Sequence, residues 1–289
     1  MDYVVTFSPI AKLVTVKIFL AFASLHNWPL FQMDVYNAFL QGNLNEEVYM
    51  QLPEGFCCHG ENKETNMVIM LIYVDDLLLT GNDAVMIDEL KHILNSDFKM
   101  KDLRELDCFL RFEILRSNER IFLSQRNYAL ELIKDIGLGG AKPVITPIVQ
   151  NMKLTTLEYD IELQQYDNDE VLTEEKEIVQ KLIGGLIYLT HTRPGITYAL
   201  HHLSQFMQQP KRSHLEAALR VVRYIKKDLR QGILLVASSS YQFNAYCESD
   251  WPSCPMTRRS ITCFCNKLGN SLISQRSKKQ NTIARSSAK

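Results

Sequence analysis

The chain has 289 residues, of which 46% are hydrophobic and 22% charged, and its formal net charge at pH 7 is −1. This composition is that of ordinary globular material and allows one large or two small domains with a sizeable core. Because the net charge is near zero, it argues against a protein that coats DNA non-specifically, which needs an excess of Lys and Arg over its whole surface.

The N-terminal sequence disfavours secretion and membrane insertion. Asp2 stands where a signal peptide would carry basic residues, and the apolar stretch at residues 18–23 is too short to cross a bilayer. We therefore expect an intracellular protein, cytoplasmic or nuclear, that is not secreted and has no membrane partner.

The seven cysteines form an odd, scattered set and not the even, regular set of a disulfide framework. We expect reduced thiols. The four nearest the C-terminal end contain no Cys-x2-Cys pair, so their spacing disfavours a zinc site. These four are Cys247, Cys254, Cys263 and Cys265.

A helix is predicted near the start of the chain. Ser8 is a typical N-cap residue, Pro9 suits the first helical position, and apolar residues continue at helical spacing as far as Asn27. Residues 30–39 then read as a buried strand that carries Asp34.

A hairpin is predicted further along the chain. Residues 67–74 are an apolar run, Asp75-Asp76 is expected to form a tight turn, and residues 77–80 form the returning strand. The hairpin therefore carries two carboxylates at its tip. After it, Asp83 is expected to cap a helix that runs to Leu94.

The middle of the chain predicts a second hairpin, from residues 109–115 and 121–123, and a helix over residues 128–136 that Gly137 ends. Residues 158–177 carry nine acidic residues against one lysine, and the stretch from about Pro143 to Glu175 lacks periodicity and is rich in acids. We expect this acidic segment to be an extended connection and not a packed element.

The C-terminal part predicts helices followed by a small sheet and a basic end. The helices are expected at residues 178–190, 196–207 and 213–227, and the strands at residues 241–246, 260–268 and 271–274.

Three aspartates suggest chemistry at a metal. Phosphoryl transfer to a nucleotide needs two divalent cations, and magnesium prefers oxygen ligands held on rigid neighbouring strands. Asp34 and the Asp75-Asp76 pair meet this need if their strands are paired. The alternative is that Asp75-Asp76 simply makes a good turn.

Longer motifs surround these aspartates. Residues 32–42 resemble the first catalytic motif of copia-type retrotransposon reverse transcriptases, and residues 73–76 resemble their Tyr-Val-Asp-Asp hairpin. The similarity covers nearly the whole chain outside the acidic segment. Other matching stretches are residues 3–12, 47–53, 122–126, 188–194 and 203–207.

The resemblance implies roles for five residues of a polymerase palm. Asp34, Asp75 and Asp76 would bind Mg²⁺ or Mn²⁺, Phe39 would exclude a ribose 2′-hydroxyl, and Tyr73 would lie beside the primer terminus. Ordinary core packing is the alternative for Phe39 and Tyr73. The implied partners are an RNA template and a DNA primer, and a virus-like particle becomes a possible location.

The end of the chain resembles the start of the family's RNase H domain. Glu248 and Asp250 stand where the family has an Asp-Ala-Asp pattern, and clustered carboxylates around metal are needed for that cleavage too. Glu248 is one methylene longer than the aspartate it replaces, and Lys289 occupies the next acidic position. The resemblance therefore implies that RNase H activity is absent.

Other departures concern the polymerase. The chain begins after the family's basic fingers segment, and between Phe56 and Met67 it has ten residues where the family has a long segment that supports nucleotide and template. Two glycines of the family are Arg104 and Arg111 here. If the glycines allow close backbone approach, arginine would obstruct it.

We therefore predict an α+β fragment of a copia-type Pol polyprotein that is catalytically defective. Its expected parts are a palm remnant at 1–150, an acidic linker at 151–177, a helical thumb or connection region at 178–240 and an incomplete RNase-H-like sheet at 241–289. A non-catalytic nucleic-acid-binding remnant is the alternative, with Arg276, Lys278 and Lys279 as the contacts. In a third interpretation, uncovered sheet edges would leave little stable protein.

Overall fold

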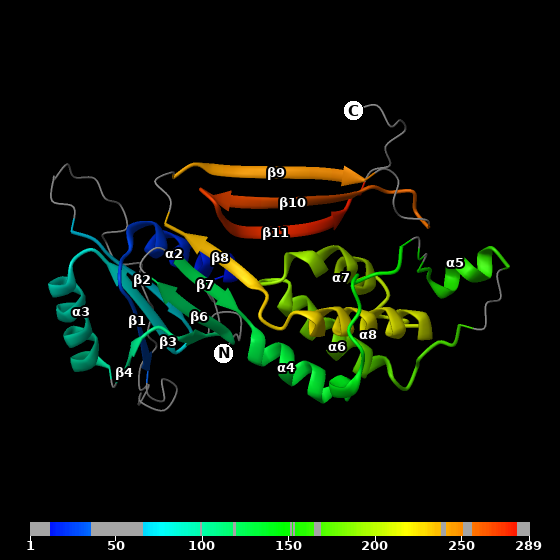
Figure 1. The fold of residues 1–289 in the computed structure, drawn as a ribbon, viewed down its shortest axis with the longest axis horizontal. Helices are drawn as coiled ribbons and strands as arrows, with labels where there is room; N and C mark the ends of the chain where they lie inside the picture. The colour runs from blue at the N-terminus through cyan, green and yellow to red at the C-terminus, as the bar shows by residue number, and fades with distance from the viewer. Residues whose placement is uncertain are drawn as a thin grey trace, which may run out of the picture. The chain divides into compact units, whose positions relative to one another are not determined.

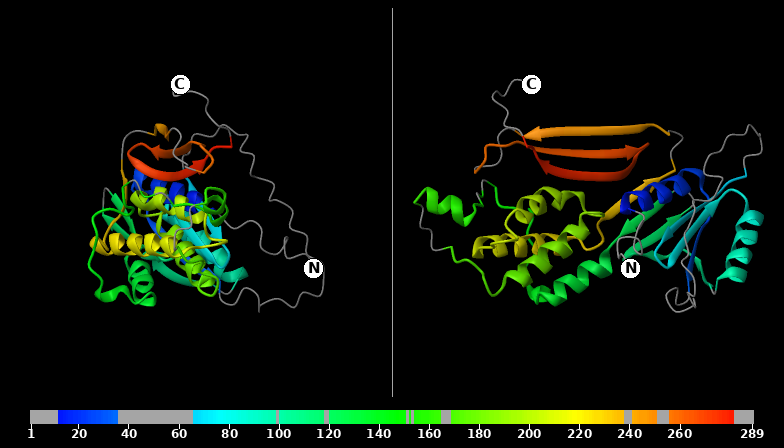
Figure 2. Two further views of the ribbon diagram at one scale, coloured as in Figure 1. Left: turned by 90° about the vertical axis from the view of Figure 1, so that its right-hand side faces the viewer. Right: turned by 180° about the vertical axis from the view of Figure 1, so that it is seen from behind.

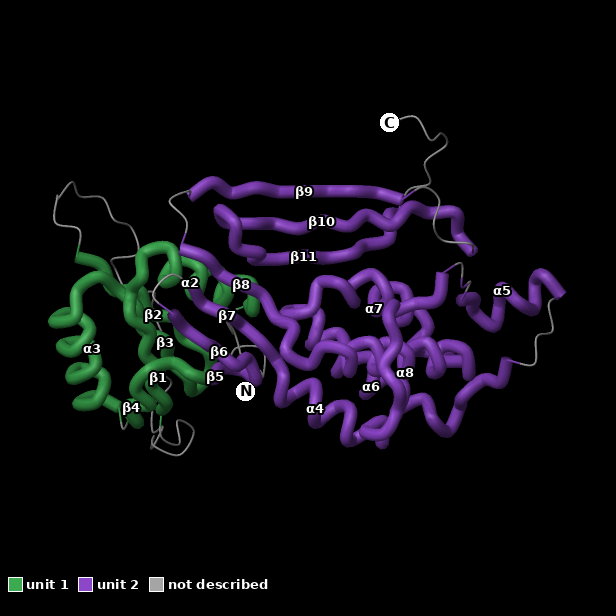
Figure 3. Tube along the Cα trace, in the orientation of Figure 1, with its two compact units in different colours: residues 1–107 green, residues 108–289 purple. Residues whose placement is uncertain are grey.

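The computed structural model describes residues 12–35, 66–98, 100–117, 120–150, 152, 154–164, 169–237, 241–250 and 256–281. The chain divides into two compact units, residues 1–107 and residues 108–289 (Figure 3). The four-part division expected from the sequence remains a prediction. Within the described residues, no helix is long and apolar enough to cross a membrane.

Unit 1 is built on a four-stranded antiparallel sheet with the strand order β2-β3-β1-β4 (Figure 1). Helix α3 packs on one face of this sheet, against the buried side chains of Met33, Leu77 and Leu79. The elements are α2 (Leu13–His26), β1 (Leu30–Val35), β2 (Val68–Tyr73), β3 (Asp76–Gly81), α3 (Ala84–Asp97) and β4 (Met100–Glu105).

The helices of unit 1 confirm two predicted boundaries. Asn27 ends α2 in the left-handed conformation, with φ of 54°. Asp83 caps α3, because its carboxylate accepts from the backbone N–H groups of Val85 and Met86. Ser8 and Pro9 lie outside the described residues.

Arg104 occupies a strained position in β4. The register between β1 and β4 shifts between Gln32 and Met33, and Arg104, opposite Gln32, has φ of 69°. A bulge with a residue in the left-handed region favours glycine. The sequence suggested that arginine would obstruct a close approach at this position; the structure gives backbone strain as the cost.

Unit 2 contains two antiparallel sheets and a group of packed helices (Figures 1 and 2). One sheet has the order β5-β6-β7-β8 and the other β11-β10-β9. The strands are β5 (Cys108–Phe109), β6 (Phe112–Ser117), β7 (Arg120–Ser124), β8 (Gly232–Val236), β9 (Phe243–Asp250), β10 (Ile261–Leu268) and β11 (Ser271–Lys279).

The helices of unit 2 share one core, to which Val179, Ile183, Leu200 and Val221 contribute fully buried side chains. The three long predicted helices are confirmed with small shifts of their ends. The helices are α4 (Arg126–Asp135), η1 (Leu138–Gly140), α5 (Leu157–Glu162), α6 (Lys176–Leu189), η2 (Pro194–Ile196), α7 (Thr197–Ser204) and α8 (Arg212–Lys227).

Two of the family-like motifs hold this unit together. The hydroxyl of Thr192 donates to Oε1 of Gln125 at 2.8 Å, and both side chains are buried. Arg193 is 1% exposed, and its guanidinium donates to the backbone oxygens of Asp228 and Leu229 at the end of α8. These carbonyls have no partner within the helix, so Arg193 supplies one.

Arg111 repeats the pattern of Arg104. It lies in the turn between β5 and β6, where Leu110 has φ of 48° and Arg111 has φ of 60°. Both arginines that replace glycines of the family therefore adopt the backbone conformation for which glycine is preferred.

The acidic segment is packed, so the expectation of an unpacked connection was wrong. Residues 157–162 form α5, and Leu154 and Leu172 are buried in the helical core with 2% and 5% exposure. The mixed helices and antiparallel sheets agree with the predicted α+β class, whereas the palm and thumb assignments remain predictions.

Candidate functional site

The predicted hairpin is formed by β2 and β3, in which Tyr73 pairs with Asp76. The turn consists of Val74 and Asp75, so Asp76 begins the returning strand and is not part of the turn as predicted. Val74 has φ of 53°. A β-branched residue in the left-handed region is strained, and such strain persists only where the surrounding structure holds it.

Asp34 lies at the end of β1, directly opposite Asp76 of β3. The next pair, Val35 and Asp75, is joined by a backbone hydrogen bond of 2.9 Å. Hydrogen-bonded and non-bonded pairs alternate in an antiparallel ladder, so Asp34 and Asp76 form a non-bonded pair, with Cα atoms about 4.5 Å apart. Their side chains share one face of the sheet, and like charges so placed repel each other.

Asp76 is held by a neighbour that the sequence interpretation did not single out. Nε2 of Gln32 donates to Oδ1 of Asp76 at 2.9 Å. Burial raises the pKa of Asp76; the Gln32 hydrogen bond opposes this, and the charges of Asp34 and Asp75 add to it. The net result is a pKa above the ordinary value, which favours the protonated carboxyl.

The metal-binding role of the three aspartates remains a prediction. Among the described residues, no group of three or more His, Cys, Asp or Glu side chains is arranged to hold a metal ion. Asp34 and Asp76 face each other and Asp75 lies in the adjoining turn, so the condition set from the sequence, that the strands be paired, is met. Phe39 lies outside the described residues, and Tyr73 is half-buried.

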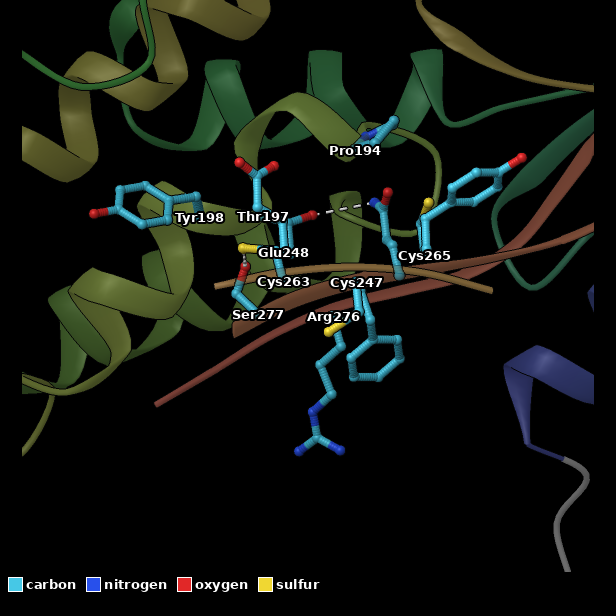
Figure 4. A pocket seen from close by; sticks show the side chains of 12 residues that line it. Pro194, Thr197, Tyr198, Cys247, Glu248, Cys263, Cys265, Arg276 and Ser277 are labelled. Atoms are coloured by element: carbon cyan, nitrogen blue, oxygen red, sulfur yellow. Dashed lines mark hydrogen bonds between the residues drawn. The ribbon is translucent and has the colours of Figure 1, made fainter. Parts of the chain in front are cut away.

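Glu248 and Asp250 lie on one face of β9, because residues two apart in a strand point the same way. Both are exposed. Glu248 lines a cavity of about 520 Å³ between the three-stranded sheet and the start of α7, with Thr197 and Cys263 among its neighbours (Figure 4). The two carboxylates therefore lie on the same face of β9. In the part of the chain that the structure describes, no third His, Cys, Asp or Glu joins them in a group that could hold a metal ion.

The predicted basic contacts do not form one surface. Arg276 and Lys278 are exposed on one face of β11, whereas Lys279 points to the other face and donates to Oε1 of Gln205 at 3.1 Å. In Figure 4, Arg276 extends away from the cavity that Ser277 faces. The ammonium of Lys279 is therefore engaged by Gln205 within the protein.

A model of the reverse transcriptase (RNA-dependent DNA polymerase) family matches the chain in two segments, residues 1–65 and 58–150. These segments contain Asp34, Asp75 and Asp76. The chain belongs to this family.

The reverse-transcriptase-family chain is 33% identical over 99% of its length to the retrovirus-related Pol polyprotein from transposon RE1 of Arabidopsis thaliana, and covers 22% of it. Identity to the corresponding polyprotein from transposon TNT 1-94 of Nicotiana tabacum is 28%, over 98% of this chain and 25% of that one. An uncharacterized mitochondrial protein of Arabidopsis thaliana is 36% identical over 75% of this chain and 86% of its own length.

The chain thus spans about a fifth of the length of the transposon RE1 polyprotein, which confirms the predicted resemblance to a fragment of a retrotransposon Pol polyprotein. The RE1 alignment covers 333 positions although the chain has 289 residues. The polyprotein therefore carries residues within the aligned region that this reverse-transcriptase-family chain lacks.

Sequence reasoning missed a groove in this reverse-transcriptase-family chain. Helices α4 and α6 and the β5–β6 turn border a cavity of about 670 Å³. Tyr128 and Tyr188 meet edge to face in its wall, at 5.3 Å, and the guanidinium of Arg111 lies 5.2 Å from the centre of the Tyr128 ring. Lys181 and Gly184 line the same cavity, and beyond the adjacent backbone of α6 no heavy atom lies within 4 Å of the position that a Cβ atom of residue 184 would occupy. No single segment carries this pattern, so spacing could not have revealed it.

Proposed function

We propose that this chain is a palm-derived fragment of a retrotransposon reverse transcriptase that does not polymerise DNA. One observation carries the proposal: Asp34 and Asp76 lie opposite each other in paired strands, but Asp76 accepts a hydrogen bond from Gln32, and no group of acidic side chains among the described residues is arranged to hold a metal ion. We likewise propose that Glu248 and Asp250 do not support RNase H cleavage.

The chemistry of the donor set explains why the residues do not fit the metal as they stand. Two-metal catalysis needs carboxylates that converge on two cations. A part-buried aspartate with a raised pKa and an amide on one oxygen offers a metal fewer lone pairs than a free carboxylate does. Mg²⁺ or Mn²⁺ would be the required ion in an active relative of this chain.

The experiment is primer extension by the purified chain on a homopolymer RNA template with a DNA primer and Mg²⁺ or Mn²⁺. Asp75→Asn and Asp76→Asn are tested in parallel, and folding of each protein is checked by a cooperative melting transition. We expect no incorporation from any of them. Incorporation by the unmodified chain that both variants abolish would overturn the proposal.

The groove between α4 and α6 favours a second candidate function, non-catalytic binding of nucleic acid. Aromatic faces beside cations suit the stacking of bases from a single strand. The groove is not a strong phosphate site, because Glu131 and Asp135 balance Arg111 and Lys181. We therefore propose contact through bases here, while Arg276 and Lys278 provide exposed positive charge on β11.

This candidate is tested by titrating a labelled RNA or DNA single strand and measuring fluorescence anisotropy at several salt concentrations. Lys181→Ala is expected to weaken binding, and Lys176→Ala, on the same helix outside the groove, is the matched control. Binding that both variants change equally would exclude the groove as a nucleic-acid site, and binding that ignores salt would exclude phosphate contacts by Arg276 and Lys278.

A further inference from the structure

The acidic segment is docked onto the start of α8 through side chains and backbone. We call residues 154–164 and 169–175 the strap. Val171 forms an isolated antiparallel bridge with Lys211, the N–H of Leu172 donates to the Pro210 oxygen at 2.8 Å, and the N–H of Arg212 donates to the Glu170 oxygen at 2.9 Å. Leu154 and Leu172 add buried apolar contacts.

A buried lysine is the polar anchor of the strap. The side chain of Lys211 is 4% exposed, and its Nζ lies 2.6 Å from Asp160 and 3.2 Å from Asp169. Asp169 also accepts from the N–H and hydroxyl of Ser213, at 2.9 and 2.7 Å. A buried charge of this kind is tolerated only while its partners stay in place.

His214 lies beneath this anchor. Its ring is fully buried and stacks on Phe206, with ring centroids 4.1 Å apart and an interplanar angle of 19°. Nδ1 of His214 accepts from the backbone N–H of Lys211 at 3.0 Å. This bond closes the capping box at the start of α8 and requires a free lone pair on Nδ1, so only the neutral ring can make it.

We propose that the strap is a reversible, acid-sensitive closure of unit 2, and that protonation of His214 is the event that releases it. This goes beyond the proposed function and does not depend on it. A proton on Nδ1 breaks the hydrogen bond to Lys211 and places a second buried cation beside the Lys211 ammonium. The strap then separates, so that His214 and Lys211 are hydrated.

The groups around His214 act on its pKa in both directions, and the net effect is a lowering. The pKa of His214 is lowered to about 4: burial and then the charge of Lys211 lower it, Asp169 and the Thr155 backbone raise it, and His202 on α7 lowers it slightly. For Asp160 and Asp169, burial raises the pKa, but Lys211 and, for Asp169, Ser213 outweigh it, so both lie below the ordinary value. These carboxylates stay ionised while His214 titrates.

Docking of the strap depends on pH because it is linked to proton binding at His214. When the strap is released, His214 of α8 binds a proton with the ordinary pKa of 6.5, whereas with the strap docked it does so only at about 4. Docking is therefore fully favoured above pH 6.5 and weakens as the pH falls towards 4. Between pH 7.5 and pH 5 the population of the released form rises on the order of 30-fold.

The test is amide hydrogen exchange in the peptides that cover residues 154–164, measured on the full chain at pH 7.5 and pH 5 and corrected for the intrinsic effect of pH. The expected result is on the order of 30-fold faster corrected exchange at pH 5. His214→Gln keeps a side chain that reaches back to the N-cap N–H but does not titrate, so its exchange is expected to change little with pH.

Controls separate release from unfolding. His92→Gln, an exposed histidine of unit 1, is expected to keep the full pH response. Asp169→Asn is expected to exchange faster than the unmodified chain at both pH values. Equal corrected exchange in the unmodified chain at both pH values, or an unchanged pH response in a folded His214→Gln, would overturn the proposal.

Discussion

Asp34 lies directly opposite Asp76 across the β1–β3 ladder, and the amide of Gln32 donates to Asp76 at 2.9 Å. The pairing of β1 with β3 thus brings two carboxylates together, and β1 supplies one of them with an amide partner. The strands that carry the aspartates are therefore paired, although the aspartates are not arranged as metal ligands. Two predictions follow from the contacts of Asp76 and Gln32.

The substitution Asp76→Asn is predicted to change the pH dependence of stability. Because the pKa of Asp76 is raised in the folded chain, chiefly by burial, the folded state binds the proton more tightly than the unfolded state. The stability from this group is present below the ordinary pKa and is lost as the pH rises through the raised value. The variant is therefore expected to be more stable than the unmodified chain at pH 7 and equal to it at low pH, in urea unfolding followed from pH 3 to 7. A variant that is less stable at pH 7 would contradict this.

The second concerns Gln32→Glu. It places a third carboxylate beside Asp34 and Asp76, so repulsion is expected to lower the melting temperature in EDTA, and added Mn²⁺ is expected to raise it again because hard oxygen ligands then converge. Gln32→Leu removes the hydrogen bond without adding charge and is the control. A melting temperature of Gln32→Glu that Mn²⁺ does not affect would show that these side chains cannot converge.

Replacement of either strained arginine by glycine is predicted to stabilise the chain. Arg104→Gly and Arg111→Gly relieve a left-handed backbone that costs an L-residue about 1–2 kcal/mol, and the exposed ion pair of Arg111 with Glu131 offsets little of this. Each variant is expected to raise the midpoint of urea unfolding. Arg120→Gly, in β7 and absent from the positive-φ residues, is expected to lower it. The same direction of change at all three positions would refute backbone strain as the cause.

Replacement of Arg193 is predicted to cause a large loss of stability. Its buried guanidinium donates to two backbone oxygens just after α8, so Arg193→Met removes a buried donor from each of them. We expect a destabilisation of about 3 kcal/mol in unit 2, by urea unfolding. Arg230→Ala, at an exposed arginine nearby, should change stability by less than about 0.5 kcal/mol. A small effect of Arg193→Met would mean that water replaces the guanidinium.

The sequence predicted those parts of the fold whose signals are local. The apolar run before Asp75 identified the hairpin, and Asp83 identified the start of α3, because capping depends on residues two or three positions away. The turn was misplaced by one residue, since Asp-Asp is a good turn pair, whereas the structure puts Val74 in the left-handed position.

Long-range partners explain the failures. The acidic segment packs because Asp160 meets Lys211, 51 residues away, and no local pattern announces that pairing. Strand β4 was missed because Met100–Glu105 is almost wholly exposed and lacks alternating hydrophobicity. For the candidate site, the aspartates and their shared sheet followed from the motifs, but the Gln32 contact depends on the β1–β3 register.

The claim that the aspartates are paired but not assembled as a metal site is tested most directly by Mn²⁺ binding. Free Mn²⁺ would be measured by electron paramagnetic resonance during titration of the folded chain, with Asp34→Asn and Asp76→Asn in parallel. We predict that the unmodified chain and both variants take up Mn²⁺ equally weakly. Stoichiometric binding to the unmodified chain that both substitutions abolish would contradict the account.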